Sequence, residues 1–561
     1  MVNWKSKKLG DILVLANGLV IIVLINLIAT TFFFRIDLTE EKRYSIKNQT
    51  KDILQNLDDE VYIEVFLEGD LNGPFTRFQK SIRETLEEFR IYSNNKVHYI
   101  FTDPSGASGQ KARSEFMNDL AARGIQPTNV IDTKDGQRVE KIIFPGAIVS
   151  VGGFESGVML LRGSKARTSE EQINQSIEGV EYELIQTIHK ITALDRKQIG
   201  FVKGHGELDS LELASLSHEL SEMYDVLSVN LNSATPLDRY DALIIAKPTT
   251  AYSPLEKFTL DQFIMKGGRV MFLLDKLDAV MDSASRQDYF AIPYDLNLDD
   301  QLFKYGVRIN LDLIQDRHSG LYPIVTGQAG GKPQMQLMEW PFFPLINHYA
   351  DHPVTRNLDA TLTRFVSSMD TVKAEGIQKT PLLFTSAYTR TITAPVNVSV
   401  NELRRAMRDE DFSKGQFPIG YLLEGKFSSL YKNRFAPEGA SGVAVIPDGV
   451  DTKIIVIADG DVARNEVNPR TGQPQVLGFD PFTNYTFANR DFIMNAIAFL
   501  VNEGGLIQVR SKEVRIRPLD KTRVKNERMK WQVINLIIPV LVLVIFGIIR
   551  ASWRKRKYAK F

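Results

Sequence analysis

The fold can be inferred from one stretch, Gln198-Ile-Gly-Phe-Val-Lys-Gly-His-Gly-Glu-Leu-Asp209. Its apolar run at 199–202 is typical of a buried strand, and the run ends abruptly at Gly204-His-Gly-Glu207. A helical segment is predicted to begin at about Ser210. A buried strand that ends in a glycine-rich turn before a helix is typical of doubly wound α/β folds, which place functional groups at the carboxyl ends of their strands.

The same alternation continues toward the C-terminus. Further strands are predicted at 224–229, 242–246, 269–274 and 453–458, and helices at 211–223, 254–266 and 491–502. Continuous apolar strands that alternate with helices indicate a parallel sheet covered on both faces. The less regular region 277–452 is interpreted as insertion loops and edge strands of the same domain, with a separate third domain as the alternative.

A smaller domain is predicted before this stretch. Its strands are expected at 61–67, 97–101, 141–151 and 157–161, and its helices at 78–92, 111–123 and 169–192. The order β-α-β-α-β-β-α is that of a thioredoxin-like domain. The chain has no cysteine, so a Cys-x-x-Cys redox site is excluded and a binding or docking module remains.

Both ends of the chain carry a long uncharged apolar run. The runs 12–34 and 531–549 are each long enough to cross a bilayer core, which needs about 20 residues. A cleaved signal peptide is the alternative for the first, but its apolar region would be only about 7–15 residues long. The short flanks outside both runs are rich in Lys and Arg, which predicts that both termini are cytoplasmic and the bulk of the chain lies outside the cytoplasm.

Composition excludes several classes of protein. Lys plus Arg and Asp plus Glu both number 68, so no global charge indicates nucleic-acid binding. No Walker A motif is present, so the chain is not itself an ATPase. A Gly-x-Ser-x-Gly elbow and a cysteine nucleophile are also absent.

A set of short motifs carries a family resemblance. They are Arg35-Ile-Asp-Leu-Thr-Glu-Glu-Lys-Arg-Tyr44, Gly204-His-Gly-Glu207, Asp241-Ala-Leu-Ile-Ile245, Gly267-Gly-Arg-Val270, Lys304-Tyr-Gly-Val307, Ala458-Asp-Gly-Asp461 and Asn489-Arg-Asp-Phe492. In this order and spacing they resemble the gliding-motility ABC transporter auxiliary family, the GldG family of exported ABC-2 auxiliary proteins. The resemblance covers nearly the whole chain, including both apolar ends.

The resemblance implies partners and a fold. The partners would be an ABC-2-type permease and a cytoplasmic ATPase, with a homo-oligomer within the complex allowed and no nucleic acid. The second domain would be flavodoxin-like, similar to class I glutamine amidotransferases and to the corresponding domain of an intraflagellar-transport subunit. The location would be the bacterial inner (cytoplasmic) membrane, with the bulk of the chain in the periplasm.

An α/β protein with two exported domains between two transmembrane helices is therefore predicted. Its expected parts are a cytoplasmic tail (1–11), a transmembrane helix (12–34), a thioredoxin-like periplasmic domain without cysteine (35–195), an amidotransferase-like periplasmic domain with insertions and a parallel sheet (196–505), a basic juxtamembrane linker (506–530), a second transmembrane helix (531–549) and a basic cytoplasmic tail (550–561). The linker either rests on anionic headgroups or is solvated.

Polar residues follow several predicted strands and form a candidate ligand-binding site. They are His205, Glu207, Asp209, Asp275, Asp459 and Asp461. At the carboxyl ends of parallel strands, a histidine with carboxylates could bind a ligand or a divalent metal, or perform acid–base chemistry. The alternative is structural: 204–207 forms a tight turn and Asp209 or Ser210 caps the next helix.

A second ambiguous feature is the aromatic run 340–344, which either marks a partner surface or packs beneath a loop. The sequence as a whole predicts a non-catalytic auxiliary subunit of an ABC-2-type transporter, with no cofactor, no metal and no catalytic residue. The alternative is a membrane-anchored periplasmic hydrolase or metal-binding protein that uses His205 and the nearby acids.

Overall fold

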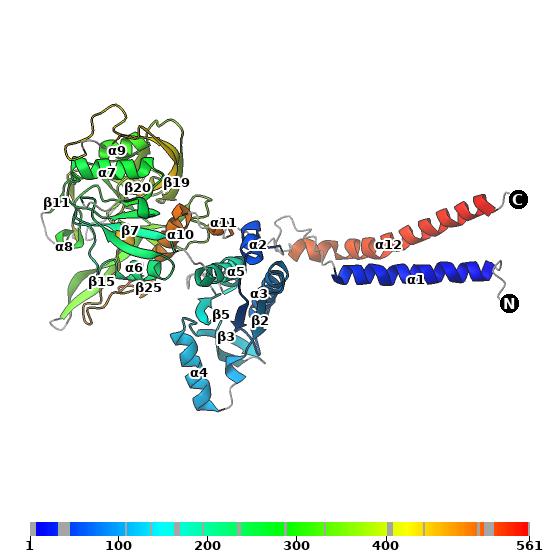
Figure 1. Ribbon diagram of the computed structural model, residues 1–561. Coiled ribbons are helices and arrows are strands. Elements are labelled where there is room, and N and C mark those ends of the chain that lie inside the picture. The colour runs from blue at the N-terminus through cyan, green and yellow to red at the C-terminus, as the bar shows by residue number, and fades with distance from the viewer. Residues whose placement is uncertain are drawn as a thin grey trace. The chain divides into compact units, whose positions relative to one another are not determined.

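The structure is a computed structural model in which the chain forms two compact units, Met1–Lys512 and Glu513–Phe561 (Figure 1). It describes residues 7–31, 45–106, 109–134, 137–161, 169–192, 196–232, 237–284, 289–329, 332–400, 408–440, 444–501, 505–509 and 521–558. The protein is of the mixed α/β class and contains several sheets, one of them large.

The first domain contains a four-stranded sheet in the order β2-β1-β5-β6. β1 and β2 are parallel, and β5 is antiparallel to both β1 and β6. Its elements are α2 (Asn48–Gln55), β1 (Val61–Val65), α3 (Gly73–Tyr92), β2 (Val97–Phe101), η1 (Pro104–Gly106), α4 (Gln110–Ala122), β3 (Thr128–Lys134), β4 (Gln137–Ile143), β5 (Gly146–Val151), β6 (Phe154–Met159) and α5 (Ser169–Thr192).

Two local predictions for this domain were wrong. The strand expected at 141–151 is divided between β4 and β5, and β3 with β4 forms a hairpin that was not predicted. Pro145 lies between the two strands, and a proline cannot donate to a strand ladder. α3 begins at Gly73, before the expected residue 78, because Asn72 Oδ1 accepts the Phe75 N–H at 3.2 Å and caps the helix.

The second domain is built around an eight-stranded sheet in the order β16-β19-β22-β23-β10-β9-β7-β8. Its strands are β7 (Gln198–Val202), β8 (Asp225–Val229), β9 (Ala242–Ala246), β10 (Arg269–Leu273), β16 (His348–Tyr349), β19 (Ile377–Phe384), β22 (Pro418–Ser428) and β23 (Asp448–Ile457). The five strands from β23 to β8 are parallel, whereas β22, β19 and β16 are antiparallel.

The sheet is therefore mixed, which corrects the prediction of a parallel sheet. The five parallel strands match the predicted apolar runs, and the irregular region contributes β16, β19 and β22 to the same sheet. These antiparallel strands were not recognised because Pro381 lies inside β19 and Gly420 and Gly425 lie inside β22. Proline and glycine are depleted in strands and give the appearance of loops.

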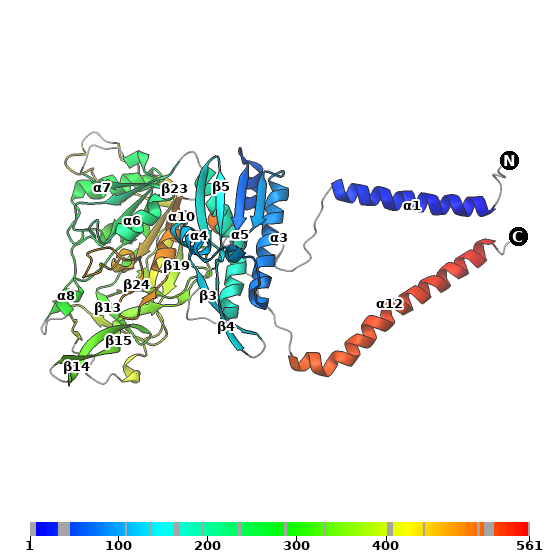
Figure 2. The same cartoon turned by 90° about the horizontal axis from the view of Figure 1, so that it is seen from below.

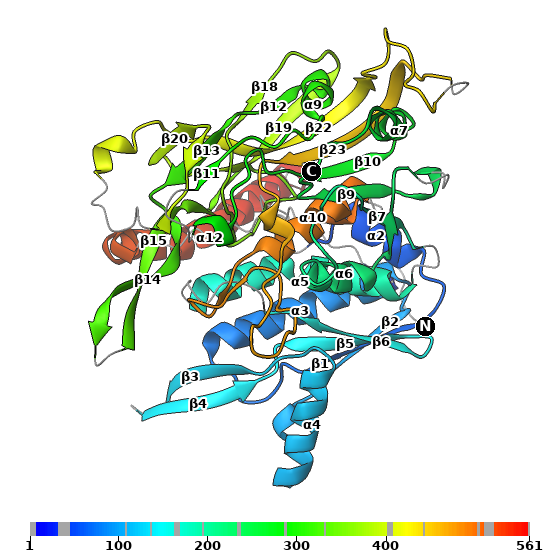
Figure 3. The same cartoon turned by 90° about the vertical axis from the view of Figure 1, so that its left-hand side faces the viewer.

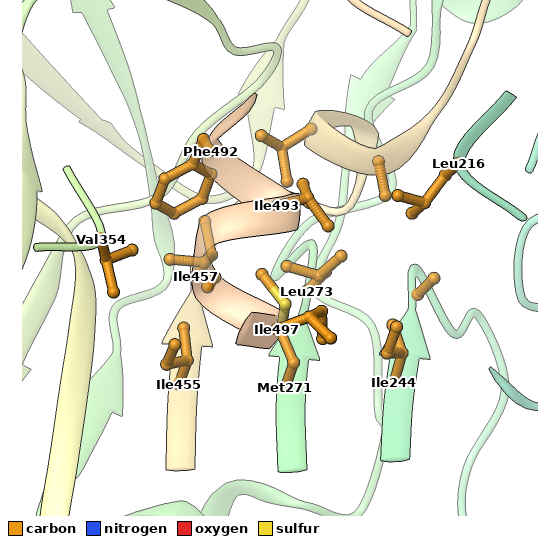
Figure 4. Packing of buried hydrophobic residues seen from close by; sticks show 14 of the residues in the cluster. Leu216, Ile244, Met271, Leu273, Val354, Ile455, Ile457, Phe492, Ile493 and Ile497 are labelled. Atoms are coloured by element: carbon orange, nitrogen blue, oxygen red, sulfur yellow. The ribbon is translucent and has the colours of Figure 1, made fainter. Parts of the chain in front are cut away.

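Helices cover both faces of the parallel part of the sheet. α6 (Ala214–Ser221) and α10 (Asn489–Val501) cover one face, where Phe492, Ile493 and Ile497 pack on strand residues (Figure 4). α7 (Pro254–Met265) and α9 (Asp299–Tyr305) cover the other face. Successive side chains of β9 point to opposite faces of the sheet, as is general for strands. Side chains of β9 on each face lie in a hydrophobic core, so both faces are buried.

Smaller elements surround this sheet. They are η2 (Leu237–Arg239), α8 (Met281–Ala284), β11 (Phe290–Ala291), β12 (Val307–Ile309), β13 (Asp312–Asp316), β14 (Ser319–Ala329), β15 (Lys332–Ile346), β17 (Thr361–Leu362), β18 (Met369–Thr371), β20 (Thr389–Thr393), β21 (Val396–Asn397), η4 (Asp409–Asp411), η5 (Asp461–Ala463), β24 (Phe479–Asp480) and β25 (Tyr485–Thr486). β14 and β15 form a long antiparallel hairpin (Figure 2). At its base Trp340, Phe342 and Phe343 are buried with Phe365, so the aromatic run is a packing element.

A short helix near the end of the first unit packs into the first domain. α11 (Leu506–Val509) contacts α2 and α5, and its Ile507 and Val509 side chains are buried in the core of that domain. The second domain is thus inserted between parts of the chain that share one core. The predicted linker 506–530 begins with this packed helix.

Two helices contain the apolar ends of the chain. Within the part of the chain that the structure describes, one helix is long and apolar enough to cross a membrane, Glu527–Arg556, which lies within α12 (Lys521–Tyr558). α1 (Lys7–Thr31) contains a shorter apolar segment, Leu13–Asn26. Residues 32–34 of the predicted first span lie outside the described residues, and its role as an anchor stays a prediction.

Candidate functional site

The site lies at the carboxyl ends of the parallel strands in the second domain. The chain passes from β7 to β8 on one side and then to β9 on the other side of β7, which makes the gap between β7 and β9 a topological switch point. In open α/β sheets, ligands bind at such a point. His205 follows β7, Lys247 follows β9, Asp275 follows β10, and Asp459 follows β23.

The first of two polar clusters is centred on His205. Its ring Nδ1 lies 3.1 Å from Glu207 Oε1 and its Nε2 lies 3.1 Å from Glu256 Oε1. The ring also stacks on Tyr252, with ring centroids 3.7 Å apart and planes inclined by 12°. The His205 carbonyl accepts the N–H groups of Thr249 and Thr250, so the loops after β7 and β9 are joined directly.

The helix α7 contributes the second carboxylate through its N-terminus. Ser253 caps this helix, and Ser253 and Glu256 form a reciprocal capping box. The Glu256 side chain accepts the Ser253 N–H at 2.8 Å through Oε2, which leaves Oε1 facing His205. The capping box of α7 therefore has a second role, because its Glu256 also contacts His205.

The charges of this cluster stabilise each other. Burial opposes the imidazolium, but hydrogen bonds to Glu207 and Glu256 prevail, so the pKa of His205 is raised above 6.5. Burial likewise opposes the Glu207 carboxylate, but its hydrogen bond with His205 holds its pKa below 4.5. The pKa of Glu256 is also lowered, because hydrogen bonds from Ser253 and His205 outweigh its burial. With its two ring nitrogens each 3.1 Å from a carboxylate, His205 links the loop after β7 to the start of α7.

The second cluster is centred on Lys247. Its ammonium lies 2.6 Å from Asp461 Oδ2 and 3.0 Å from Asp275 Oδ2. Asp459 Oδ1 accepts the Asp461 N–H at 2.7 Å, and its Oδ2 accepts the Arg364 N–H at 3.0 Å. The lysine and the three aspartates are buried, and the Arg364 side chain is largely buried. The cluster is therefore an internal charge network that spans three strand ends.

The backbone at Lys247 is in the left-handed region, with φ at +56°. This conformation is uncommon for a residue other than glycine, and it is retained only where the surroundings hold it. Gly460 fits closely against it, because a Cβ at that position would lie 2.6 Å from Lys247 Cβ. Phe365, which follows Arg364, also has a positive φ, +52°. Strain at two positions beside one cluster shows that the packing there is tightly constrained.

The carboxylates of this cluster differ in acidity. Burial raises the pKa of Asp275 to about 6 against the attraction of Lys247. Burial and the neighbouring Asp275 and Asp461 raise the pKa of Asp459 well above its usual range. The pKa of Asp461 is lowered, since Lys247, Arg364 and Arg464 outweigh its burial. Within the cluster, Asp461 is thus the principal anionic partner of Lys247.

The structure divides the six predicted residues into three groups. His205 and Glu207 belong to one cluster, and Asp275, Asp459 and Asp461 to the other. Asp209 belongs to neither: its Oδ1 accepts the N–H groups of Leu211 and Glu212, each at 2.8 Å, in the turn before α6. The prediction that Asp209 or Ser210 caps the next helix is wrong, because α6 begins only at Ala214, after Leu213, and has no side-chain cap; Asp209 instead holds the turn that precedes it.

Sequence reasoning missed Lys247, Tyr252, Glu256 and Arg364. Lys247 follows the apolar run of β9 directly, in the way that Asp275 follows β10, so the same rule could have found it. Ser253-Pro254-Leu255-Glu256 has the Ser-x-x-Glu spacing of a capping box with proline at the first turn, which is a recognisable helix start. Arg364 and Tyr252 carry no comparable sequence signal.

The arrangement does not offer an open metal site. Across the described ranges, no group of three or more histidine, aspartate or glutamate side chains is placed to hold a metal ion. The ammonium of Lys247 instead provides positive charge among Asp275 and Asp461. With His205 3% exposed and Lys247 6% exposed, the two clusters are internal parts of the domain.

Comparison with known proteins defines the class. Residues 196–496, more than half of the chain, match a family described as "ABC-type uncharacterized transport system". Residues 40–150 match a family described as a domain of unknown function (DUF7088). The chain belongs to the first of these families, and it is an auxiliary component of an ABC-type transport system.

One relative matches nearly the whole chain. A Borreliella burgdorferi protein named only as an uncharacterized protein is 23% identical over 567 residues, covering 98% of this chain and 99% of that protein. Among solved structures, the mmIFT52 N-terminal domain matches at 14% identity with a TM-score of 0.31, covering 54% of this chain and 97% of that one. A likeness of this size supports no conclusion about function.

Proposed function

We propose that this chain is a non-catalytic subunit anchored at both ends in the bacterial inner membrane, beside an ABC-2-type permease and a cytoplasmic ATPase. Residues 1–11 and 550–561 then lie in the cytoplasm, and the two α/β domains lie in the periplasm. One observation carries the non-catalytic part of the proposal. The charged groups at the switch point of the large sheet are engaged with one another, with both nitrogens of His205 facing carboxylates at 3.1 Å.

The proposed folds of the two domains agree with this role. The sheet order β2-β1-β5-β6, with one parallel pair, supports a thioredoxin-like first domain. The five parallel strands of the large sheet support a flavodoxin-like or class I amidotransferase-like second domain. Neither has a cysteine with which to perform the chemistry of those enzymes, so the similarity would be one of fold alone.

Anchoring at both ends has a physical advantage for such a subunit. It keeps the two domains within reach of the permease and raises their effective concentration there. The apolar surface of α12, which is long enough to span a bilayer, supports packing in the membrane or against permease helices. The domains would bind, or transmit motion to, a component outside the membrane, and the family resemblance links that process to gliding motility.

Co-purification tests this proposal. The tagged full-length chain is extracted from its native membrane in detergent, and the proteins that accompany it are identified by mass spectrometry. A permease and an ATPase recovered in a steady ratio would support the proposal. Recovery of this chain alone, in a detergent that preserves another membrane complex in the same extract, would contradict it.

The competing hypothesis is a membrane-anchored hydrolase or metal-binding protein that uses His205. Replacing both His205 and Glu207 by alanine separates the two hypotheses in cells. A hydrolase would lose its function although its complex remained intact. A non-catalytic subunit would retain its function as long as the second domain stays folded, and would lose it when the apolar segment of α12 is exchanged for an unrelated membrane helix.

A further inference from the structure

A cleft of about 810 Å³ lies between the two domains, which both belong to the compact unit Met1–Lys512. The first domain lines it with the end of α4, with β6 and with α5, and the second domain lines it with the end of α6, the loop after β16 and the start of α10. α5 covers one face of the first-domain sheet and lies between this sheet and α6 (Figure 3). Ligand sites occur preferentially in clefts of this size between domains.

β6 is an edge strand, because the first-domain sheet has the order β2-β1-β5-β6. The two-residue turn 152–153 joins it to β5, so Val151 and Phe154 form the first hydrogen-bonded pair of the hairpin. Hydrogen-bonded and non-hydrogen-bonded pairs then alternate along the two strands. The backbone N–H and carbonyl groups of every second residue therefore face away from β5, and these residues are Glu155, Gly157 and Met159.

These three residues all line the cleft. Across the part of the chain that the structure describes, no hydrogen bond joins their backbone N–H or carbonyl groups to another group. The residues between them face β5, and Leu160 continues that set, since its N–H donates to the Pro145 carbonyl at 2.9 Å. The cleft thus contains backbone donors and acceptors that repeat every two residues. An extended peptide has the same repeat, and addition of a strand to an open sheet edge is a recurring mode of peptide recognition.

The charges of the cleft indicate what kind of segment it accepts. Three ion pairs line it, each of one cation and one carboxylate: Arg123 with Glu155, Lys190 with Glu222, and Arg490 with Asp491. Glu183 and Asp359 add two further carboxylates to the lining, so acidic residues outnumber basic ones. Val476, 51% exposed, offers an apolar contact from the second domain. A segment that carries lysine or arginine beside apolar residues complements this lining.

We propose that the edge of β6 binds an extended segment of a partner protein as an added strand, and that this segment contains lysine or arginine. The outward backbone groups of β6 supply the hydrogen bonds, and the carboxylates of the cleft attract the cations. The strand is held in place beside its edge, because a Cβ on Gly157 would lie 2.0 Å from the Arg123 carbonyl oxygen at the end of α4. The proposal goes beyond the auxiliary role described above and does not depend on how the chain is anchored.

Selection from a phage-displayed library of random peptides, with the full-length chain in detergent as the target, tests the proposal. The expected peptides are rich in lysine or arginine and in strand-forming residues. They should bind Glu155→Pro about tenfold more weakly than Glu155→Ala, because both variants lose the same carboxylate and only proline removes the outward N–H. The two variants should share one thermal midpoint, since that N–H takes no part in the pairing with β5. Peptides rich in aspartate or glutamate, equal binding to both variants, or no enrichment at all would overturn the proposal.

A second measurement leaves the protein unchanged. A selected peptide that is N-methylated at alternate backbone positions should lose its binding in one of the two possible patterns of methylation, because only one set of amides faces β6. On binding of the unmodified peptide, hydrogen exchange resolved to single amides should slow at Glu155, Gly157 and Met159. It should change little at Ser156 and Val158, which already face β5. Equal tolerance of both methylation patterns, or slowed exchange elsewhere in the chain without slowing at these three amides, would overturn the proposal.

Discussion

The Lys247 ammonium lies 2.6 Å from Asp461 Oδ2, although 214 residues separate the two in the sequence. A third group, Asp275, lies 3.0 Å from the same ammonium. The lysine thus joins the ends of β9, β10 and β23 in the interior of the large sheet. One charged side chain therefore connects three adjacent strands of the sheet. The third of them, β23, comes from far along the chain.

Replacement of Lys247 by methionine is predicted to destabilise the second domain strongly. Removing one partner of a buried ion pair leaves an uncompensated charge and costs about 3–5 kcal/mol. In a domain of this size that loss lowers the thermal midpoint by about 6–15 °C. Thermal unfolding of the full chain in detergent, followed by circular dichroism, measures it.

The matched control is Lys432→Ala, which removes an exposed partner of Asp448. Exposed pairs contribute little, so no measurable change is expected there. If Lys247→Met unfolds at the temperature of the parent, the buried network does not hold the three strand ends together.

The His205 cluster predicts a stability that declines as pH rises. Because the pKa of His205 is raised in the folded protein, the stabilisation that His205 provides is fully present below pH 6.5, its ordinary pKa. This stabilisation is lost as the pH rises through the higher pKa of the folded state. The lowered pKa values of Glu207 and Glu256 mean that their contributions are present above 4.5 and are lost as pH falls through the folded values. The contribution of this cluster is therefore greatest between 4.5 and 6.5.

Urea unfolding of the parent and of His205→Gln over pH 5 to 9 checks this prediction. Glutamine keeps one donor but does not titrate, so the difference in stability between the two proteins should shrink as pH rises above 6.5. A difference that stays constant over the whole range would show that His205 is not charged in the folded protein.

The parallel core was predictable because its strands are continuous apolar runs that end in glycine or a polar residue. The antiparallel extension was not, because β19 and β22 contain proline and glycine and their pairing depends on partners far along the chain. The same contrast holds for the site. Asp275 and Asp459 were identified because they directly follow strands, whereas Glu256 reaches His205 from a helix whose position only the folded structure provides.

The close approach of the β7 and β9 loops predicts a specific sensitivity at Gly206. Its φ is +71°, and a Cβ there would lie 2.1 Å from Thr249 Oγ1. Gly206→Ala should therefore destabilise the domain through both backbone strain and a clash. Addition of Thr249→Ala should remove the clash and restore part of the thermal midpoint, which distinguishes the two causes.

Gly472→Ala serves as the control for backbone strain alone. Gly472 has a similar φ, +67°, but no atom lies within 4 Å of its added Cβ. The Gly472→Ala substitution should lower the free energy of unfolding by about 1–2 kcal/mol, the penalty of the left-handed conformation for a residue with a side chain. Equal losses at Gly206 and Gly472 would mean that the two loops are not in close contact.

Because α11 is buried against α2 and α5, a substitution in α11 should destabilise these two helices of the first domain. Val509 is 1% exposed in the core that also contains residues of α2 and α5. Val509→Asp places a charge in that core and should cost several kcal/mol. Hydrogen exchange of the full chain should then become faster in α2 and α5, while the strands β9 and β10 stay protected. Val450→Asp, at a position 55% exposed, should change neither region. Unchanged exchange in α2 and α5 after Val509→Asp would show that the first domain is complete without α11.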